Sequence, residues 1–202
     1  QFSSMILGAD GFARISYQAI SGGNLKFARC LDVDCISRNI RVIDTVGNVG
    51  TYTALTLDEG GLAHISYRDD TNGDLKYARC TDADCAGNII TAVDNSGDLG
   101  QYKTSITLEG DGFARISYYD DAADDLKFAR CTNADCTTRI ITVVDSSGDV
   151  GRYSSMEIGS DGYARVSYYD ASNGSLKFAQ CVNQDCANSN ISIPDTSGDV
   201  GR

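Results

Sequence analysis

The sequence lacks several features that define common classes of protein. It has no tryptophan, one histidine, one proline and no apolar run near the roughly 18 residues that a membrane-spanning helix needs. Acidic side chains outnumber basic ones by 28 to 17, so no basic stripe is present to bind a phosphate backbone. The N-terminal residues do not read as a signal peptide. We therefore expect no nucleic-acid partner and no membrane span.

Short runs of β-forming residues separated by turn residues make up the chain instead. It contains 21 glycines and 11 tyrosines, and its runs of Tyr, Ile, Thr, Ser and Val are interrupted by Asp-Gly and Asn-Gly pairs. This alternation is typical of an all-β protein with tight hairpins. A chain of 202 residues is also long enough to bury a sizeable core.

The cysteines occur in four pairs with the same C-x4-C spacing. The pairs are Cys30 and Cys35, Cys80 and Cys85, Cys131 and Cys136, and Cys181 and Cys186. A zinc site would need ligands from two repeats and usually shows C-x2-C spacing. Regular, even-numbered pairs favour local disulfides and an oxidising compartment. We therefore expect four disulfides and an extracellular or cell-surface location.

Internal repetition determines the predicted architecture. Aligned on the cysteines, the chain divides into repeat 1 (1–50), repeat 2 (51–100), repeat 3 (101–151) and repeat 4 (152–201). The repeats match residue for residue over long stretches. Arg202 then occupies the position of Thr51, Gln101 and Arg152. We expect one repeat domain that is a segment of a longer array.

Each repeat is predicted to fold into a four-stranded antiparallel meander. In repeat 2 the expected strands cover 52–57, 62–67, 75–80 and 89–93, with turn residues between them. Both faces of such a sheet carry large apolar residues, so the sheet must stack on its neighbours. The predicted fold class is all-β: four tandem units of about 50 residues, each with one disulfide, arranged as a β-propeller or as an open stacked array.

Acidic turns join successive repeats. They contain the pairs Asp44 and Asn48, Asp94 and Asp98, Asp145 and Asp149, and Asp195 and Asp199. Two carboxylates around a Ser-Gly turn can supply oxygen ligands to Ca²⁺. The same residues also suit a turn closed by a hydrogen bond from side chain to backbone. Calcium binding and a purely structural turn both stay open here.

One tyrosine column and two sequons point to carbohydrate. Tyr17, Tyr67, Tyr118 and Tyr168 occupy equivalent positions, where they can either stack on sugar rings or pack between sheets. Asn173 and Asn190 begin N-x-S triplets, which are glycosylation acceptors in secreted proteins. Glycans are therefore one expected class of partner.

Repetition argues against catalysis. An enzyme site is an asymmetric set of nucleophile, base and orienting groups, whereas nearly every polar residue of this chain recurs in all four repeats. His64, the only histidine, occupies the column of Arg14, Arg115 and Arg165. We therefore expect no catalytic residues and no enzymatic activity.

Three strings carry a resemblance to known repeats. ISYYD at 116–120, NGDLKYARC at 72–80 and DSSGDVG at 145–151 resemble the tandem, propeller-blade-like β repeats of bacterial and archaeal secreted surface proteins. The resemblance implies an extracellular or cell-surface setting and carries over no ligand. The S-x-D-x-G-x-T-W Asp-box of sialidases is absent from the sequence.

The expected function is that of a non-enzymatic structural or adhesive repeat protein, a rigid building block of a cell-surface appendage or filament. Its partners would be neighbouring repeats or other copies of the same protein. The alternative is a multivalent, lectin-like β-propeller with one weak glycan site per repeat.

Overall fold

The computed structural model describes residues 2–201, which form sixteen β-strands in four separate sheets. We call each sheet a blade. Blade 1 contains β1 (Ser3–Leu7), β2 (Ala13–Ala19), β3 (Asn24–Cys30) and β4 (Arg38–Asp44). Blade 2 contains β5 (Val49–Leu57), β6 (Ala63–Asp69), β7 (Asp74–Cys80) and β8 (Asn88–Asp94). Blade 3 contains β9 (Leu99–Leu108), β10 (Ala114–Asp120), β11 (Asp125–Cys131) and β12 (Arg139–Asp145). Blade 4 contains β13 (Val150–Ile158), β14 (Ala164–Asp170), β15 (Ser175–Cys181) and β16 (Ser189–Asp195).

Every blade is an antiparallel meander of four consecutive strands, which confirms the predicted fold class. The strands of blade 2 agree with the predicted ranges to within three residues, and β5 begins three residues earlier than predicted. As a result, the predicted repeat boundaries fall inside β5, β9 and β13 rather than between blades. The first hairpin of each blade turns at a glycine with positive φ, such as Gly61 at 77°, as a tight Asp-Gly or Gly-Gly turn requires.

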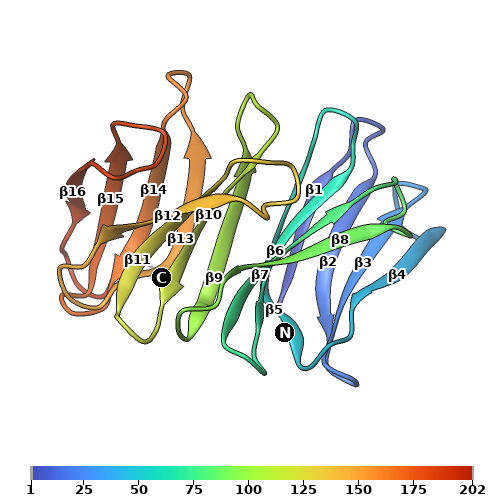
Figure 1. Ribbon diagram of the computed structural model, residues 1–202, viewed down its shortest axis with the longest axis horizontal. Helices are drawn as coiled ribbons and strands as arrows, with labels where there is room; N and C mark the ends of the chain where they lie inside the picture. The colour runs from blue at the N-terminus through green and yellow to red at the C-terminus, as the bar shows by residue number, and fades with distance from the viewer. Residues whose placement is uncertain (1, 202) are drawn as a thin grey trace.

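The blades follow one another in chain order (Figure 1). β5 contacts β1 on one side and β9 on the other, and β9 in turn contacts β13. The first strands of the blades therefore lie together, as in a propeller. Blade 1 and blade 4 lie at opposite ends of the molecule in Figure 1, so the arc is open. No helix among residues 2–201 is long and apolar enough to cross a bilayer.

The core lies between the blades, in three separate apolar clusters. In the first, Leu25 and Phe27 of blade 1 pack against Ile65 and Tyr67 of blade 2, and all four side chains are fully or almost fully buried. Equivalent residues form the clusters between blades 2 and 3 and between blades 3 and 4. Both faces of β6 are buried because alternate side chains point to opposite neighbours.

A buried polar triad accompanies each cluster. Asp44 accepts hydrogen bonds from the Tyr67 hydroxyl at 2.7 Å and from the Lys76 ammonium at 2.5 Å. The same triad joins blades 2 and 3 through Asp94, Tyr118 and Lys127. Between blades 3 and 4 it consists of Asp145, Tyr168 and Lys177. Each triad fixes the stacking register because a buried charge is stable only when its partners are in place.

All four predicted disulfides are present, and residues 2–201 hold no free cysteine. Each disulfide closes the turn between the third and fourth strands, with Cα atoms 4.7–4.8 Å apart. The second cysteine of each pair has a positive φ, 54° at Cys35, so the disulfide fixes a left-handed turn residue.

Candidate functional site

Three tyrosines on the first strands have an unusual backbone conformation. Tyr52, Tyr102 and Tyr153 have φ values of 50°, 65° and 55°. The pairing of β5 with β6 shifts register between Thr51 and Ala54, as a β-bulge does, and β9 and β13 show equivalent shifts. A left-handed conformation at a non-glycine residue costs on the order of 1–3 kcal/mol and clusters at functional sites. β-bulges also re-aim side chains at such sites.

The bulges bring the three tyrosines into one cavity of about 680 Å³. Phe2 completes its aromatic lining, so all four blades contribute a ring. Neighbouring ring centroids are 4.1 Å apart for Phe2 and Tyr52, and 5.5 Å apart for Tyr102 and Tyr153. We call this the aromatic cavity. Aromatic faces that open onto a hollow of this size are suited to a ligand with apolar ring faces.

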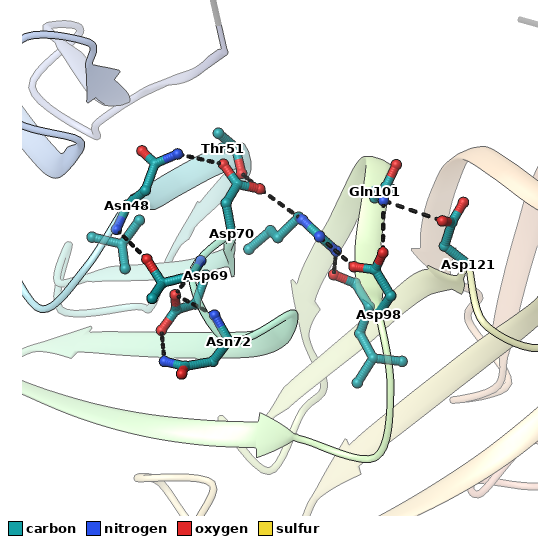
Figure 2. Close-up of polar contacts among 12 residues, drawn as sticks. Asn48, Thr51, Asp69, Asp70, Asn72, Asp98, Gln101 and Asp121 are labelled. Atoms are coloured by element: carbon teal, nitrogen blue, oxygen red, sulfur yellow. Dashed lines mark hydrogen bonds and ion pairs between the residues drawn. The ribbon is translucent and has the colours of Figure 1, made fainter.

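A cluster of polar side chains lies where blades 2 and 3 meet (Figure 2). We call Arg68, Asp70, Asp98, Gln101 and Asp121 the acidic cluster. Arg68 donates to Asp70 at 2.7 Å and also forms an ion pair with Asp98. The Gln101 amide nitrogen donates to Asp98 at 3.1 Å and to Asp121 at 3.2 Å. One amide thus bridges the carboxyl group of Asp98, in the connection between blades 2 and 3, and that of Asp121, in the turn after β10.

The two bridged carboxyl groups have different surroundings. Burial raises the pKa of Asp121, and the negative charge of Asp98 raises it further, against a smaller opposite effect of Arg152 and Arg68. Asp98 instead binds the Arg68 guanidinium, and its side chain is 43% exposed to solvent. Asp121 is therefore the group of the pair suited to hold a proton, while Asp98 forms an ion pair with Arg68.

The acidic cluster borders the aromatic cavity. Gln101 and Thr51 directly precede Tyr102 and Tyr52, and the Thr51 hydroxyl donates to Asp70 at 2.9 Å. On the blade 3 side, the Arg152 guanidinium carbon lies 4.6 Å from the centroid of the Tyr102 ring. The acidic cluster is thus connected to the walls of the aromatic cavity along the strands that carry Tyr52 and Tyr102.

The repeat pattern breaks at the positions that form the acidic cluster. The column of Arg68 holds Gln18, Tyr119 and Tyr169 in the other repeats. The column of Asp121 holds Ile20, Asp70 and Ala171, and that of Gln101 holds Gln1, Thr51 and Arg152. The combination at blades 2 and 3 is therefore unique within the chain. A comparison of the repeats reveals this signal at positions 68, 101 and 121, whereas the predicted site residues all came from positions that recur in the four repeats.

The tyrosine column predicted to bind glycans lies elsewhere. Tyr67, Tyr118 and Tyr168 are 0%, 0% and 1% exposed, and each hydroxyl bonds to an aspartate of the preceding blade. Tyr17, on the outer face of blade 1, is half-buried. The three buried rings offer no face to a sugar, which contradicts the glycan-binding prediction for them.

The residues predicted as calcium ligands do not converge. Asp44, Asp94 and Asp145 bind tyrosine and lysine of the next blade, and Asp195 binds Ser197 in its own turn. The second members of the pairs face other partners: Asn48 contacts Asp70, and Asp149 contacts Arg152. Within residues 2–201, no group of three or more acidic, histidine or cysteine side chains is arranged to hold a metal ion. Calcium binding stays a prediction.

Both sequon asparagines are exposed, Asn173 in the turn before β15 and Asn190 on β16. The Asn173 amide donates to Asp170 at 3.0 Å. Glycosylation at these positions also stays a prediction.

Known structures share this fold, although the sequence shares little with them. No protein-family model matches the sequence, and no curated protein matches it. An α-L-arabinofuranosidase from Lactobacillus brevis is 12% identical, with a TM-score of 0.59 over 94% of this chain and 71% of the enzyme. An exo-β-1,3-galactanase from Phanerochaete chrysosporium is 11% identical, with a TM-score of 0.61 over 96% of this chain and 49% of that one. A puromycin hydrolase variant is 14% identical, with a TM-score of 0.54 over 93% of this chain and 30% of its own.

These similarities establish a β-propeller-like fold and correct two predictions. The expectation of a non-enzymatic structural or adhesive protein, with a lectin-like alternative, is wrong, because several solved chains with this arrangement of blades are glycoside hydrolases. The exclusion of enzymatic activity fails for the same reason. It assumed that repeated blades carry no asymmetric set of polar side chains, and the acidic cluster is such a set. At these identities the shared feature is the fold, and the chain spans about half the length of the galactanase.

Proposed function

We propose that this chain acts on carbohydrate and hydrolyses a glycosidic bond at the site formed by the aromatic cavity and the acidic cluster. The observation that carries the proposal is the unique pair Asp98 and Asp121, bridged by Gln101 beside a cavity walled by strained tyrosines. The fold shared with glycoside hydrolases, one of them solved with galactose, supports it.

The two carboxyl groups suit the two roles that this chemistry requires. Glycoside hydrolases commonly pair a carboxylic acid, which protonates the leaving oxygen, with a carboxylate that acts as nucleophile or activates water. Asp121 has the raised pKa of the acid. Asp98, paired with Arg68, takes the role of the carboxylate. A sugar ring stacked on Tyr52 or Tyr102 would lie beside both groups.

We further propose that the protein works outside the cell. Four disulfides suit an oxidising compartment and resemble those of secreted repeat proteins. Polysaccharide is also encountered there as an extended polymer, which an open cavity can accept along its length.

The test is release of sugar from a panel of aryl glycosides and from arabinan, β-1,3-galactan and xylan. We expect the wild type to release sugar from at least one of them. Asp121→Asn and Asp98→Asn should each lower kcat by at least about 100-fold, because acid or base catalysis contributes on the order of 10²–10⁴. Activity should also fall as the pH rises through the raised pKa of Asp121, since the acid then loses its proton.

Asp199→Asn is the matched control, because Asp199 is the equivalent of Asp98 in repeat 4 and lies outside the site. It should retain wild-type activity. Absence of release from the whole panel, or equal activity of the wild type and Asp121→Asn, would refute hydrolysis at this site.

A further inference from the structure

The three interfaces between blades use the same two surfaces. We call the surface that packs against the next blade the trailing face and the surface that packs against the preceding blade the leading face. Leu25, Leu75 and Leu126 on trailing faces are all 0% exposed, and so is Tyr67 on the leading face of blade 2. Each interface therefore buries one trailing face and one leading face, and it closes around one Asp, Tyr and Lys triad.

The trailing face of blade 4 has no blade against it. Leu176 and Phe178 are only half-buried, although their equivalents in the first three blades are fully or almost fully buried. Among residues 2–201, Asp195, the equivalent of Asp44 and Asp145, accepts side-chain and backbone hydrogen bonds only from Ser197 of its own turn. This face thus presents an apolar surface and a carboxylate without its usual tyrosine and lysine.

The leading face of blade 1 is also exposed, and its exposed groups complement those of the trailing face of blade 4. Met5 is 61% exposed, whereas its equivalents Leu55, Ile106 and Met156 are 7%, 8% and 3% exposed. Within residues 2–201 the Tyr17 hydroxyl and the Lys26 ammonium have no hydrogen-bond or ion-pair partner. Their equivalents Tyr67 and Lys76 both bind Asp44. Tyr17 and Lys26 thus lack the carboxylate that their equivalents bind, and a carboxylate is the group that blade 4 offers.

We propose that the trailing face of blade 4 docks on the leading face of blade 1 in a second copy of this chain. Asp195 of one copy would then bind Tyr17 and Lys26 of the other, and Leu176 and Phe178 would cover Ile15 and Met5. The chain already forms this type of interface three times, and the two open faces would form it once more. Blades 1 and 4 of one chain lie at opposite ends of the molecule, so they do not complete the interface with each other (Figure 1).

The contact joins two different surfaces, so it is heterologous, and it is weaker than the internal interfaces. An arginine of each trailing face pairs with an aspartate of the next blade, as Arg29 does with Asp84 at 3.0 Å. Blade 4 has Gln180 at that position and Pro194 in place of Ile43. One ion pair and one aliphatic contact are therefore missing from the joint, so we expect assembly to depend on protein concentration.

The test is the mass of the purified chain by sedimentation across a range of concentrations. We expect the wild type to reach at least twice the monomer mass as concentration rises. Asp195→Lys and Lys26→Glu should each weaken association by at least about tenfold, because each places like charges together in a desolvated contact. The double variant Asp195→Lys with Lys26→Glu restores opposite charges and should recover the association.

Glu59→Lys is the matched control, because it makes the same change of charge on an exposed hairpin of blade 2 away from both faces. It should associate as the wild type does, and circular dichroism should show that all variants are folded. A wild type that is monomeric at every concentration, or association unaffected by both single reversals, overturns the proposal. Failure of the double variant to recover association would also overturn it.

Discussion

At the scale of single residues, three tyrosines have a strained backbone that the packing between blades does not require. Tyr52, Tyr102 and Tyr153 keep a left-handed backbone in three successive blades, although a glycine would adopt it without a steric penalty. Four cysteines also have a positive φ, but a disulfide fixes each of them. The tyrosines have no covalent constraint, so their conformation is maintained by the bulge and by the rings that they contact.

This strain leads to a prediction about stability. Tyr52→Gly should be more stable than Tyr52→Ala by about 1 kcal/mol, because both variants lose the ring but only alanine retains the steric penalty of a positive φ. Urea denaturation of the two variants measures the difference. As a control, the same two substitutions at Tyr163, which has no positive φ, should give the opposite order. Equal stability at position 52 would show that the bulge relaxes when the ring is removed.

Individual residues were also the hardest part to predict from sequence. Alternation assigned Tyr52 to the start of a regular strand, because tyrosine favours strands and nothing in its neighbours encodes a bulge. The predicted column, Tyr67, Tyr118 and Tyr168, recurs because every interface between blades needs it. Near-identical repeats therefore mark the scaffold where they agree. They mark the candidate site where they differ, as at Arg68 and Asp121.

At the scale of strands and blades, the sequence was more informative. Turn residues and alternation predicted the four strands of blade 2 to within three residues, because these signals are local. The cysteine spacing predicted all four disulfides. The polar triads were not predicted as such, because Asp44, Tyr67 and Lys76 lie on three different strands and meet only when two blades stack.

The triads give a prediction about the interfaces between blades. Lys177→Met should lower the free energy of unfolding by about 2 kcal/mol, because the buried Asp145 carboxylate loses its ammonium partner. Lys26→Met is the matched control in repeat 1, where no aspartate within residues 2–201 forms an ion pair with the lysine. In dilute solution it should change stability by less than about 0.5 kcal/mol. Chemical denaturation measures both, and equal losses would argue against a stabilising role for the triad.

The same triads set the response to acid. Burial alone would raise the pKa of Asp145, but hydrogen bonds from Lys177, Ser147 and Tyr168 outweigh it, so the pKa is lowered on folding. A group with a lowered pKa stabilises the fold above its unfolded pKa, and this contribution is lost as the pH falls through the folded value. Asp44 and Asp94 also have lowered pKa values, so the interfaces between blades lose stability together in acid.

At the scale of the whole molecule, the open arc makes the blades unequal. Blades 2 and 3 are packed on both faces, whereas blades 1 and 4 are each packed on one. Sequence periodicity predicted the stacking but left ring and open array undecided, because closure depends on the small rotation between neighbouring blades. That rotation is set by side-chain packing across the interfaces, which no local pattern encodes.

This difference in packing predicts that amide hydrogens of the central blades exchange more slowly than those of the end blades. Amides of β6, β7, β10 and β11 should exchange more slowly than those of β2, β3, β14 and β15, because opening an end blade breaks one interface and opening a central blade breaks two. Exchange measured by mass spectrometry in dilute solution would show this difference. Uniform protection across the four blades would instead indicate that the chain unfolds as a single cooperative unit.

The order of the sheets along the chain affects how the number of blades can change during evolution. Each sheet uses four consecutive strands, and no strand is exchanged between the two ends of the chain. Near-identical repeats recombine readily at the level of the gene, and the number of blades then changes in whole steps without leaving a sheet incomplete. Because each blade contributes one ring to the aromatic cavity, such a step also adds or removes one wall of the site. Copy number is thus a means of resizing the cavity that requires no new point mutation.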